Sequence, residues 1–368
     1  MSKAMAVIVV FVFCATTGEI HARLQGPPHG VASPAPSLRL LRFSPDGHYI
    51  LAQDESAVMV LTAQPLAILF RAPAENAGAA WFTPDSQQLV FVTSATSANS
   101  QRIVLVGPPA HVERWDIANH ARMQSTEVRL PPCDTEVLSP DGRALACVDF
   151  GGTLRLIDIR RGETILEVKQ FGRQKVSGDL LHPRGYSVWG DPGAADIDFS
   201  PDGRFVIAAP DGMKSDGSAV GFDLRQRKPI KLTGSLRDLP RRVWAFIAPE
   251  RVLLAELDLE DPTVTAALVA FPSGKVLLKS KIPAGGVLSP ATDPGFVLIH
   301  PFGLYAFYDP QAKRTAAVEY RTGEVIISET PALDVFGNHY VAQLPSGEIG
   351  LYERGKLAPA ATVRLDTR

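Results

Sequence analysis

Residues 169–194 carry the densest set of side chains that could bind a ligand. His182, Arg184, Tyr186 and Trp189 lie close together in this Gly-containing segment. Aromatic and arginine side chains on an exposed loop are typical of interaction hot spots. These residues therefore predict a surface that binds a protein or peptide. In the alternative, Tyr186 and Trp189 fold back over the neighbouring sheet as local core.

A second group of candidate ligands is acidic. These residues are Asp54, Glu55, Asp149, Asp211, Asp216, Asp258, Glu260, Asp261 and Asp309. Such carboxylates could attract a basic partner, and Asp211 with Asp216 could hold a weak Ca²⁺ ion. Asp is also a good turn former, and we favour that role over a metal site. The basic residues Arg237, Arg241 and Arg242 could lie near these acids and pair with them.

The sequence lacks the motifs of common catalytic sites. It contains no GxSxG, HExxH, P-loop or GxGxxG pattern. His182 and Asp179 could form a base and its partner, but a single His–Asp pair in a loop is a weak signal. We therefore predict no catalytic residue, no metal and no cofactor, and we favour a non-enzymatic role.

Two cysteines flank a predicted hairpin. Cys133 and Cys147 lie on either side of the turn Ser139-Pro140-Asp141-Gly142. They would face each other if the strand register matches, and an oxidising compartment would then permit a disulfide. A slip of one residue would place them on opposite faces. The alternative is two small buried thiols.

A repeated turn positions all these residues. Phe43-Ser44-Pro45-Asp46-Gly47 recurs from Phe82, Leu138 and Phe199, each time before an apolar run. Pro presets φ, Asp bonds its own backbone and Gly accepts a positive φ, so each copy predicts a tight β-hairpin. Fainter copies are Ile247-Ala248-Pro249-Glu250, Ile299-His300-Pro301-Phe302-Gly303 and Phe336-Gly337-Asn338.

A second turn recurs in phase with the first, as in Ile159-Arg160-Arg161-Gly162-Glu163 and Tyr320-Arg321-Thr322-Gly323-Glu324. Each repeat of about 49 residues thus contains four short strands, which is typical of a β-propeller blade. We predict an all-β, seven-bladed propeller over residues 38–366, with six or eight blades as alternatives. Trp81, Trp115 and Trp244 fall on predicted strands and are expected to pack between blades.

The blade pattern resembles that of WD-repeat and TolB-type propellers. The FSPDG-like turns carry the resemblance, together with Arg114-Trp115-Asp116-Ile117 and Leu156-Ile157-Asp158-Ile159 on the third strands. The resemblance implies a propeller fold and a broad habit of binding proteins.

The first residues resemble an export signal. Lys3 precedes an apolar run over residues 4–15, and Ile20-His21-Ala22 is a candidate cleavage site. This run is too short to span a bilayer but fits the apolar part of a signal peptide. We predict a signal over 1–22, a Pro/Gly-rich linker over 23–37, and a secreted or periplasmic protein with no membrane span in its mature form.

The composition limits the class of partner. The 368 residues carry a formal net charge of −2 at pH 7, with 45% hydrophobic and 21% charged residues. This balance fits a packed protein and disfavours a nucleic-acid binder that acts through bulk charge. We expect a monomer that binds a protein or peptide through one rim of the propeller. The alternative is a lactonase- or dehydrogenase-like propeller enzyme with its site at the mouth of the central channel.

Overall fold

The structure is a computed structural model, and all the residues that it describes belong to one compact unit, Ala35–Arg368. The described residues are 38, 40–54, 56–74, 77, 80–94, 110–128, 133–149, 152–169, 171, 195–210, 219–256, 263–283, 286–301, 315–322, 324–328 and 333–365.

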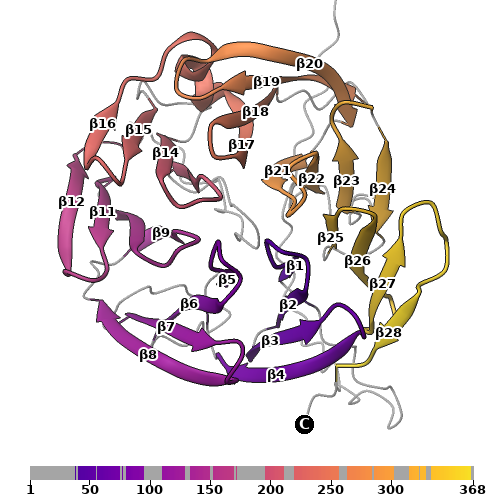
Figure 1. The fold of residues 1–368 in the computed structure, drawn as a ribbon. Helices are drawn as coiled ribbons and strands as arrows, with labels where there is room; N and C mark the ends of the chain where they lie inside the picture. Colours follow the sequence, from indigo (N-terminus) through magenta and orange to yellow (C-terminus); the bar gives the residue numbers. More distant parts are fainter. Residues whose placement is uncertain are drawn as a thin grey trace, which may run out of the picture. The chain divides into compact units, whose positions relative to one another are not determined.

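The described residues form seven four-stranded antiparallel sheets, the blades, arranged in a ring (Figure 1). Blade 1 contains β1 (Leu40–Phe43), β2 (Tyr49–Gln53), β3 (Ala57–Thr62) and β4 (Ala67–Pro73). Blade 2 contains β5 (Trp81–Phe82), β6 (Gln88–Ser94), β7 (Ala110–Asp116) and β8 (Ala121–Val128). Blade 3 contains β9 (Cys133–Leu138), β10 (Ala144–Asp149), β11 (Leu154–Asp158) and β12 (Glu163–Val168). Blade 4 contains β13 (Ala195–Phe199), β14 (Phe205–Pro210), β15 (Val220–Asp223) and β16 (Lys228–Ile230).

The remaining blades follow the same order. Blade 5 contains β17 (Arg242–Ala248), β18 (Arg251–Glu256), β19 (Thr263–Ala270) and β20 (Lys275–Pro283). Blade 6 contains β21 (Gly286–Pro290), β22 (Phe296–Pro301), β23 (Thr315–Glu319) and β24 (Val325–Ser328). Blade 7 contains β25 (Leu333–Phe336), β26 (His339–Gln343), β27 (Ile349–Glu353) and β28 (Ala361–Val363). The predicted seven-bladed fold is therefore confirmed.

In each blade the four strands pair in sequence order, from the innermost to the outermost (Figure 1). We call them strands A to D. Because blades 1 and 7 each contain four consecutive strands of their own, the ring closes without a strand shared between them.

The repeated turns form as their residue types predict. In blade 1, the Ser44 amide donates to the Tyr49 carbonyl at 2.9 Å, and the Ser44 hydroxyl donates to the Asp46 carboxylate at 2.6 Å. Gly47 closes the turn with φ of 76°. In blade 2, Ser86 adopts φ of 59° at the glycine position, and its hydroxyl accepts a hydrogen bond from the Asp46 amide of blade 1.

Apolar side chains on both faces of each blade form the core. Successive residues of a strand point to opposite faces, so one strand contributes to two blade interfaces. Ile50 and Ala52 pack against residues of blade 7, whereas Leu51 between them packs towards blade 2. All three side chains are fully buried. The predicted packing of Trp115 and Trp244 between blades is confirmed by their places in such clusters.

Two local predictions differ from the structure. The turn expected at residues 299–303 of blade 6 is wrong, because residues 299–301 end β22. The turn between β21 and β22 uses Asp293-Pro294-Gly295 instead, where the Phe296 amide donates to the Asp293 carbonyl at 3.0 Å. The link at 234–242 contains a 3-10 helix, η1 (Gly234–Arg241), which buries Leu236 and Leu239 between blades 4 and 5.

A buried carboxylate joins the first and last blades. Asp334 of β25 has no exposed surface. It accepts hydrogen bonds from the Phe43 amide of blade 1 at 2.7 Å, and from the amide and hydroxyl of Thr292 of blade 6 at 2.9 and 2.6 Å. The Leu38 amide also donates to Gln343 of blade 7 at 3.1 Å. Side-chain bonds and apolar packing therefore close the ring.

Asp334→Ala is expected to destabilise the protein strongly. The variant leaves buried donors of Phe43 and Thr292 without their acceptor, which predicts a loss of about 3–5 kcal/mol in the free energy of unfolding. Urea unfolding followed by tryptophan fluorescence measures the change. The exposed Glu163→Ala variant should lose less than about 1 kcal/mol. Equal stability of the two variants would contradict this role of Asp334.

Stability is also expected to fall in acid. The Thr83 hydroxyl and the Gln87 amide donate to Asp85 and hold the pKa of its carboxyl below the usual value. A lowered pKa in the folded state stabilises the protein above the unfolded value of about 3.9, and this stabilisation is lost as pH falls through the folded value. Asp85→Asn should therefore narrow the difference in unfolding free energy between pH 7 and pH 3. An unchanged difference in urea titrations at the two pH values would show that Asp85 does not contribute.

Candidate functional site

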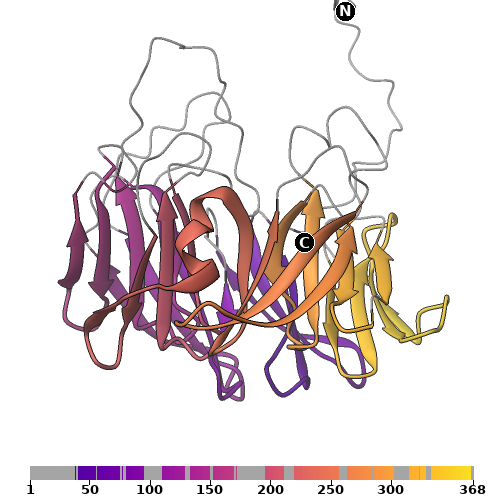
Figure 2. The same ribbon diagram turned by 90° about the horizontal axis from the view of Figure 1, so that it is seen from above.

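The two rims of the ring carry different kinds of connection. Since neighbouring strands run antiparallel, the A–B and C–D turns share one rim, which we call the turn rim. The B–C connections and the links between blades share the other, which we call the B–C rim. Figure 2 shows the described turns along the lower edge of the ring.

The longest connections belong to the B–C rim. Those on the turn rim are short, as at residues 63–66, 139–143 and 224–227. On the B–C rim, much longer stretches separate consecutive strands, namely residues 95–109, 211–219 and 302–314 between strands B and C, and 169–194 between blades 3 and 4. The ring is thus compact on one rim and carries its extra sequence on the other.

Most of the predicted binding residues lie outside the described part of the chain. These are His182, Arg184, Tyr186 and Trp189 in the link after blade 3, and Asp211 and Asp216 in the B–C connection of blade 4. Arg241 ends η1 and Arg242 begins β17, but only their backbone is described. Their proximity to one another therefore stays a prediction.

The two predicted cysteines lie on neighbouring strands. Cys133 begins β9 and pairs in register with Asp149 of β10, beyond a bulge, whereas Cys147 pairs with Glu136. Cys147 is disulfide-bonded. The side chain of Cys133 lies outside the description, so the pairing of these two residues stays a prediction.

The described acids of the B–C rim are bonded within their own blades. One oxygen of Asp54 accepts hydrogen bonds from the amides of Ser56 and Ala57 at 2.7 and 2.8 Å. Asp149 accepts a hydrogen bond from Arg155 at 2.6 Å, and this bond is the main cause that raises the pKa of Arg155. At these two positions the acids shape the loops, which is the turn-forming role favoured from the sequence.

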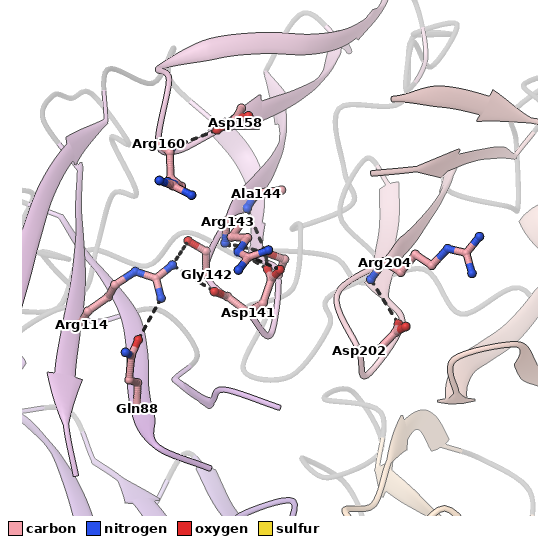
Figure 3. Close-up of polar contacts among 11 residues, drawn as sticks. Gln88, Arg114, Asp141, Gly142, Arg143, Ala144, Asp158, Arg160, Asp202 and Arg204 are labelled. Atoms are coloured by element: carbon pink, nitrogen blue, oxygen red, sulfur yellow. Dashed lines mark hydrogen bonds and ion pairs between the residues drawn. The ribbon is translucent and has the colours of Figure 1, made fainter. Parts of the chain in front are cut away.

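Arg114 binds blade 2 to the A–B turn of blade 3 on the turn rim (Figure 3). Its guanidinium donates to the carbonyls of Asp141 and Gly142 at 3.0 and 2.7 Å, and to Gln88 at 3.3 Å. Burial lowers the pKa of Arg114, the charge of Asp141 opposes this, and the charge of Arg143 adds to the lowering. Arg114 therefore acts as an inter-blade contact.

Three further arginines of the turn rim lie beside aspartates. Arg143 has a side chain 70% exposed and lies 3.7 Å from the Asp141 carboxylate. Its backbone amide also donates to that carboxylate, as the amides of Arg160 and Arg204 donate to the carboxylates of Asp158 and Asp202 (Figure 3). Each of these arginines thus lies beside an aspartate in the sequence of its turn, and such a mixed surface attracts neither charge strongly.

The side chain of Arg42 of β1 contacts two other blades of the ring. Its guanidinium lies 4.2 Å from the centre of the Trp81 ring of blade 2 and donates to the Pro290 carbonyl of blade 6 at 3.2 Å. Burial lowers the pKa of Arg42, and the charges of Asp334 and Asp198 oppose this. Burial likewise raises the pKa of Asp334, against the charge of Arg42 and the donors of Thr292. The positive charge of Arg42 therefore lies near two carboxylates, and these contacts contribute to cohesion between blades.

The role of these inner charges was missed in the sequence. Asp198 accepts a hydrogen bond from the Phe246 amide of blade 5 at 2.8 Å, so it repeats the role of Asp334 between blades 4 and 5. The available signal was a charged residue within a short apolar strand next to the repeated turn, as in Leu40-Leu41-Arg42-Phe43 and Leu333-Asp334-Val335-Phe336.

No group of three or more His, Cys, Asp or Glu side chains in the described ranges is arranged to hold a metal ion. No helix in the described part of the chain is long and apolar enough to cross a membrane.

Comparison with known proteins identifies the architecture. No protein-family model matches the chain, and no curated protein matches it. The structure is similar to that of hydrazine synthase from Kuenenia stuttgartiensis, with a TM-score of 0.51 and 14% identity over 90% of this chain and 99% of that chain. It is also similar to the Cps50 (Swd1) β-propeller domain from Myceliophteria thermophila, with a TM-score of 0.50 and 12% identity over 88% of this chain and 98% of that chain. At such low identity the likeness identifies the fold alone, which is that of a WD-repeat-like β-propeller.

Proposed function

We propose that this chain is an exported, non-enzymatic propeller that binds a protein or peptide partner through its B–C rim. The observation that carries the proposal is the contrast between the two rims. Short turns occupy one rim, and the long connections at residues 95–109, 169–194 and 302–314 belong to the other.

A rigid ring with long connections on one rim suits recognition. Binding residues are concentrated on loops that a rigid scaffold holds in place, because loops tolerate sequence change without loss of the core. The connection at 169–194 contains Arg184, Tyr186 and Trp189. These residue types dominate the energetics of many protein interfaces, since they offer large contact areas and directional hydrogen bonds.

Export is the second part of the proposal. It is supported by Lys3 and the apolar run at residues 4–15, followed by the small, polar residues Thr16, Thr17 and Gly18 and by the candidate cleavage site Ile20-His21-Ala22. A disulfide at Cys147 is compatible with an oxidising compartment outside the cytoplasm.

The binding proposal is tested with two matched sets of substitutions. A peptide library displayed on phage is first selected against the purified mature protein, and the affinity of a selected peptide is measured by calorimetry. Combined Tyr186→Ala and Trp189→Ala should weaken binding at least about tenfold. Combined Arg161→Ala and Arg225→Ala on the turn rim should leave the affinity unchanged.

The thermal unfolding midpoint separates a lost contact from a lost fold, and it should be the same in both variants. Retained affinity in the Tyr186/Trp189 variant would refute the assigned surface. A loss confined to the Arg161/Arg225 variant would move the binding surface to the turn rim.

The export proposal predicts a processed N-terminus. The protein expressed in its host should be recovered from the periplasm or medium, and mass spectrometry should find Arg23 as its first residue. Replacing Ile8, Val9 and Val10 with Asp breaks the apolar run and should retain the full chain in the cytoplasm. Recovery of uncleaved protein from the cytoplasm before any substitution would contradict export.

A further inference from the structure

The outermost strands of blades 4 and 5 are rich in lysine. Five lysines lie in or next to β16 and β20, all of them exposed, namely Lys228, Lys231, Lys275, Lys279 and Lys281. Neither strand contains an acidic residue. Because the formal net charge of the whole chain is −2, this positive charge is a local feature of two blades.

The outermost strands of the other five blades show no such excess. β4 contains one arginine, β8 contains one arginine and one glutamate, and β12 contains two glutamates. β24 and β28 contain no charged residue. The lysines are therefore not a general property of strand D in this ring.

The segment that links blades 4 and 5 connects the two groups of lysines. The Thr233 hydroxyl donates to the Ser273 carbonyl, in the turn before β20, at 2.9 Å. After Thr233, η1 packs in the cluster between the two blades, and its Arg237 is exposed (Figure 1). η1 also contains Asp238, whose side chain lies outside the described part of the chain. The segment thus adds one exposed cation between β16 and β20.

The strand register places two lysines of β20 on the same side as this segment. Lys279 lies opposite Ala267 of β19, and Ala267 packs in the cluster between blades 4 and 5. Residues directly opposite in a sheet share a face, and so do residues two apart in one strand. Lys279 and Lys281 therefore point towards blade 4, where Lys231 and Arg237 lie.

The acids that the structure describes do not neutralise these cations. The ion pairs described in blades 4 and 5 are made by Arg204 and Arg227, and none of them includes Arg237 or one of the five lysines. A lysine side chain carries a strongly hydrated charge on a flexible stem. Six cations on one surface without described acidic partners attract a body that presents many negative charges.

Protection of the edge strand explains only part of this pattern. Lysines on an edge strand discourage pairing with a strand of another molecule. That role does not explain Lys231 and Arg237, which lie outside the strands. It also does not explain the aliphatic side chains of Val276 and Leu277 on β20, which are 40% and 48% exposed. The surface therefore combines cations with exposed aliphatic groups.

An anionic lipid bilayer matches both features. Its phosphate groups attract lysine and arginine, and apolar side chains enter the boundary between the head groups and the acyl chains. Single-stranded nucleic acid usually stacks its bases on aromatic side chains, and β16 and β20 contain none. We propose that the outer surface of blades 4 and 5 binds the surface of an anionic phospholipid bilayer. The five lysines and Arg237 contact the phosphates, and Val276 and Leu277 enter the head-group layer.

The test uses vesicles of two compositions. Vesicles of equal parts phosphatidylglycerol and phosphatidylcholine are anionic, and vesicles of phosphatidylcholine alone are not. The chain begins at Arg23, because the apolar run at residues 4–15 could insert by itself, and the compact unit Ala35–Arg368 stays intact. Co-sedimentation should show binding to the anionic vesicles only. Raising NaCl from about 0.1 M to about 0.5 M should weaken this binding by about tenfold or more, because salt screens the charges.

Two variants test the named residues. Combined Lys275→Gln, Lys279→Gln and Lys281→Gln should weaken binding to the anionic vesicles by about tenfold or more. Leu277→Ser should weaken it by about threefold or more, since less apolar surface enters the bilayer. Unchanged affinity in Leu277→Ser would show a response to charge alone and would overturn the assignment to a bilayer.

A matched control removes three positive charges elsewhere. Arg321, Lys356 and Arg364 are exposed residues of blades 6 and 7. Their combined replacement by Gln should leave the vesicle affinity within about twofold, because charges distant from the contact are screened. Thermal unfolding midpoints check that every variant is folded.

Three further results would overturn the proposal. The first is equal binding to the two kinds of vesicle, or binding to neither, which would leave the lysines as protection of an edge strand. The second is equal affinity in the lysine variant and the control variant, which would place the contact elsewhere. The third is binding of a DNA duplex or of polyglutamate that the lysine variant abolishes while the vesicles do not bind, which would make this a surface for a soluble polyanion.

Discussion

Each blade has two apolar faces, and the rest of the structure depends on burying both. A four-stranded sheet can bury each face only against another blade. Ile50 and Leu51 illustrate that both faces are buried, because these adjacent residues of one strand pack in different blade interfaces. A blade at the end of an open array would expose one face to water. The closed ring removes that cost, and it brings the innermost strands of all blades close to the axis.

In the closed ring, the backbone amides of the innermost strands need hydrogen-bond acceptors. Strand A is the edge strand of each blade, so the backbone groups on its inner side have no neighbouring strand to bond them. Buried amides of this kind need other acceptors. Asp334 and Asp198 supply such acceptors to the Phe43 and Phe246 amides of the following blades. The charge of Arg42 interacts favourably with both carboxylates. The inner residues Arg42, Asp198 and Asp334 are thus used for cohesion between blades.

Local sequence predicted the hairpins because the chemistry of a turn is contained within a few residues. Pro, Asp and Gly at fixed spacing determine the turns that begin at Ser44, Ser139 and Ser200. The A–B turn of blade 6 was predicted at the wrong residues. Pro301 ends a strand there, whereas Asp293-Pro294-Gly295 makes the turn. The 3-10 helix also escaped prediction, because Leu236 and Leu239 gain their burial from blades 4 and 5.

The candidate sites were less predictable for a related reason. Arg42 and Asp334 are distant in sequence, and only the closed ring brings their charges together. Trp115 could be assigned to the gap between blades from its strand position. That Glu113 beside it would bond Ser125 of the neighbouring strand depends on the register between β7 and β8, which no local pattern records.

The junction between blades 7 and 1 differs from the other six junctions between neighbouring blades. Elsewhere the polypeptide itself continues from one blade to the next, but blade 7 meets blade 1 only through contacts such as Asp334 with Phe43 and Gln343 with Leu38. Tension that pulls these two blades apart would therefore meet no covalent resistance at this seam. Mechanical unfolding would start there, and the blades on either side would peel away in turn.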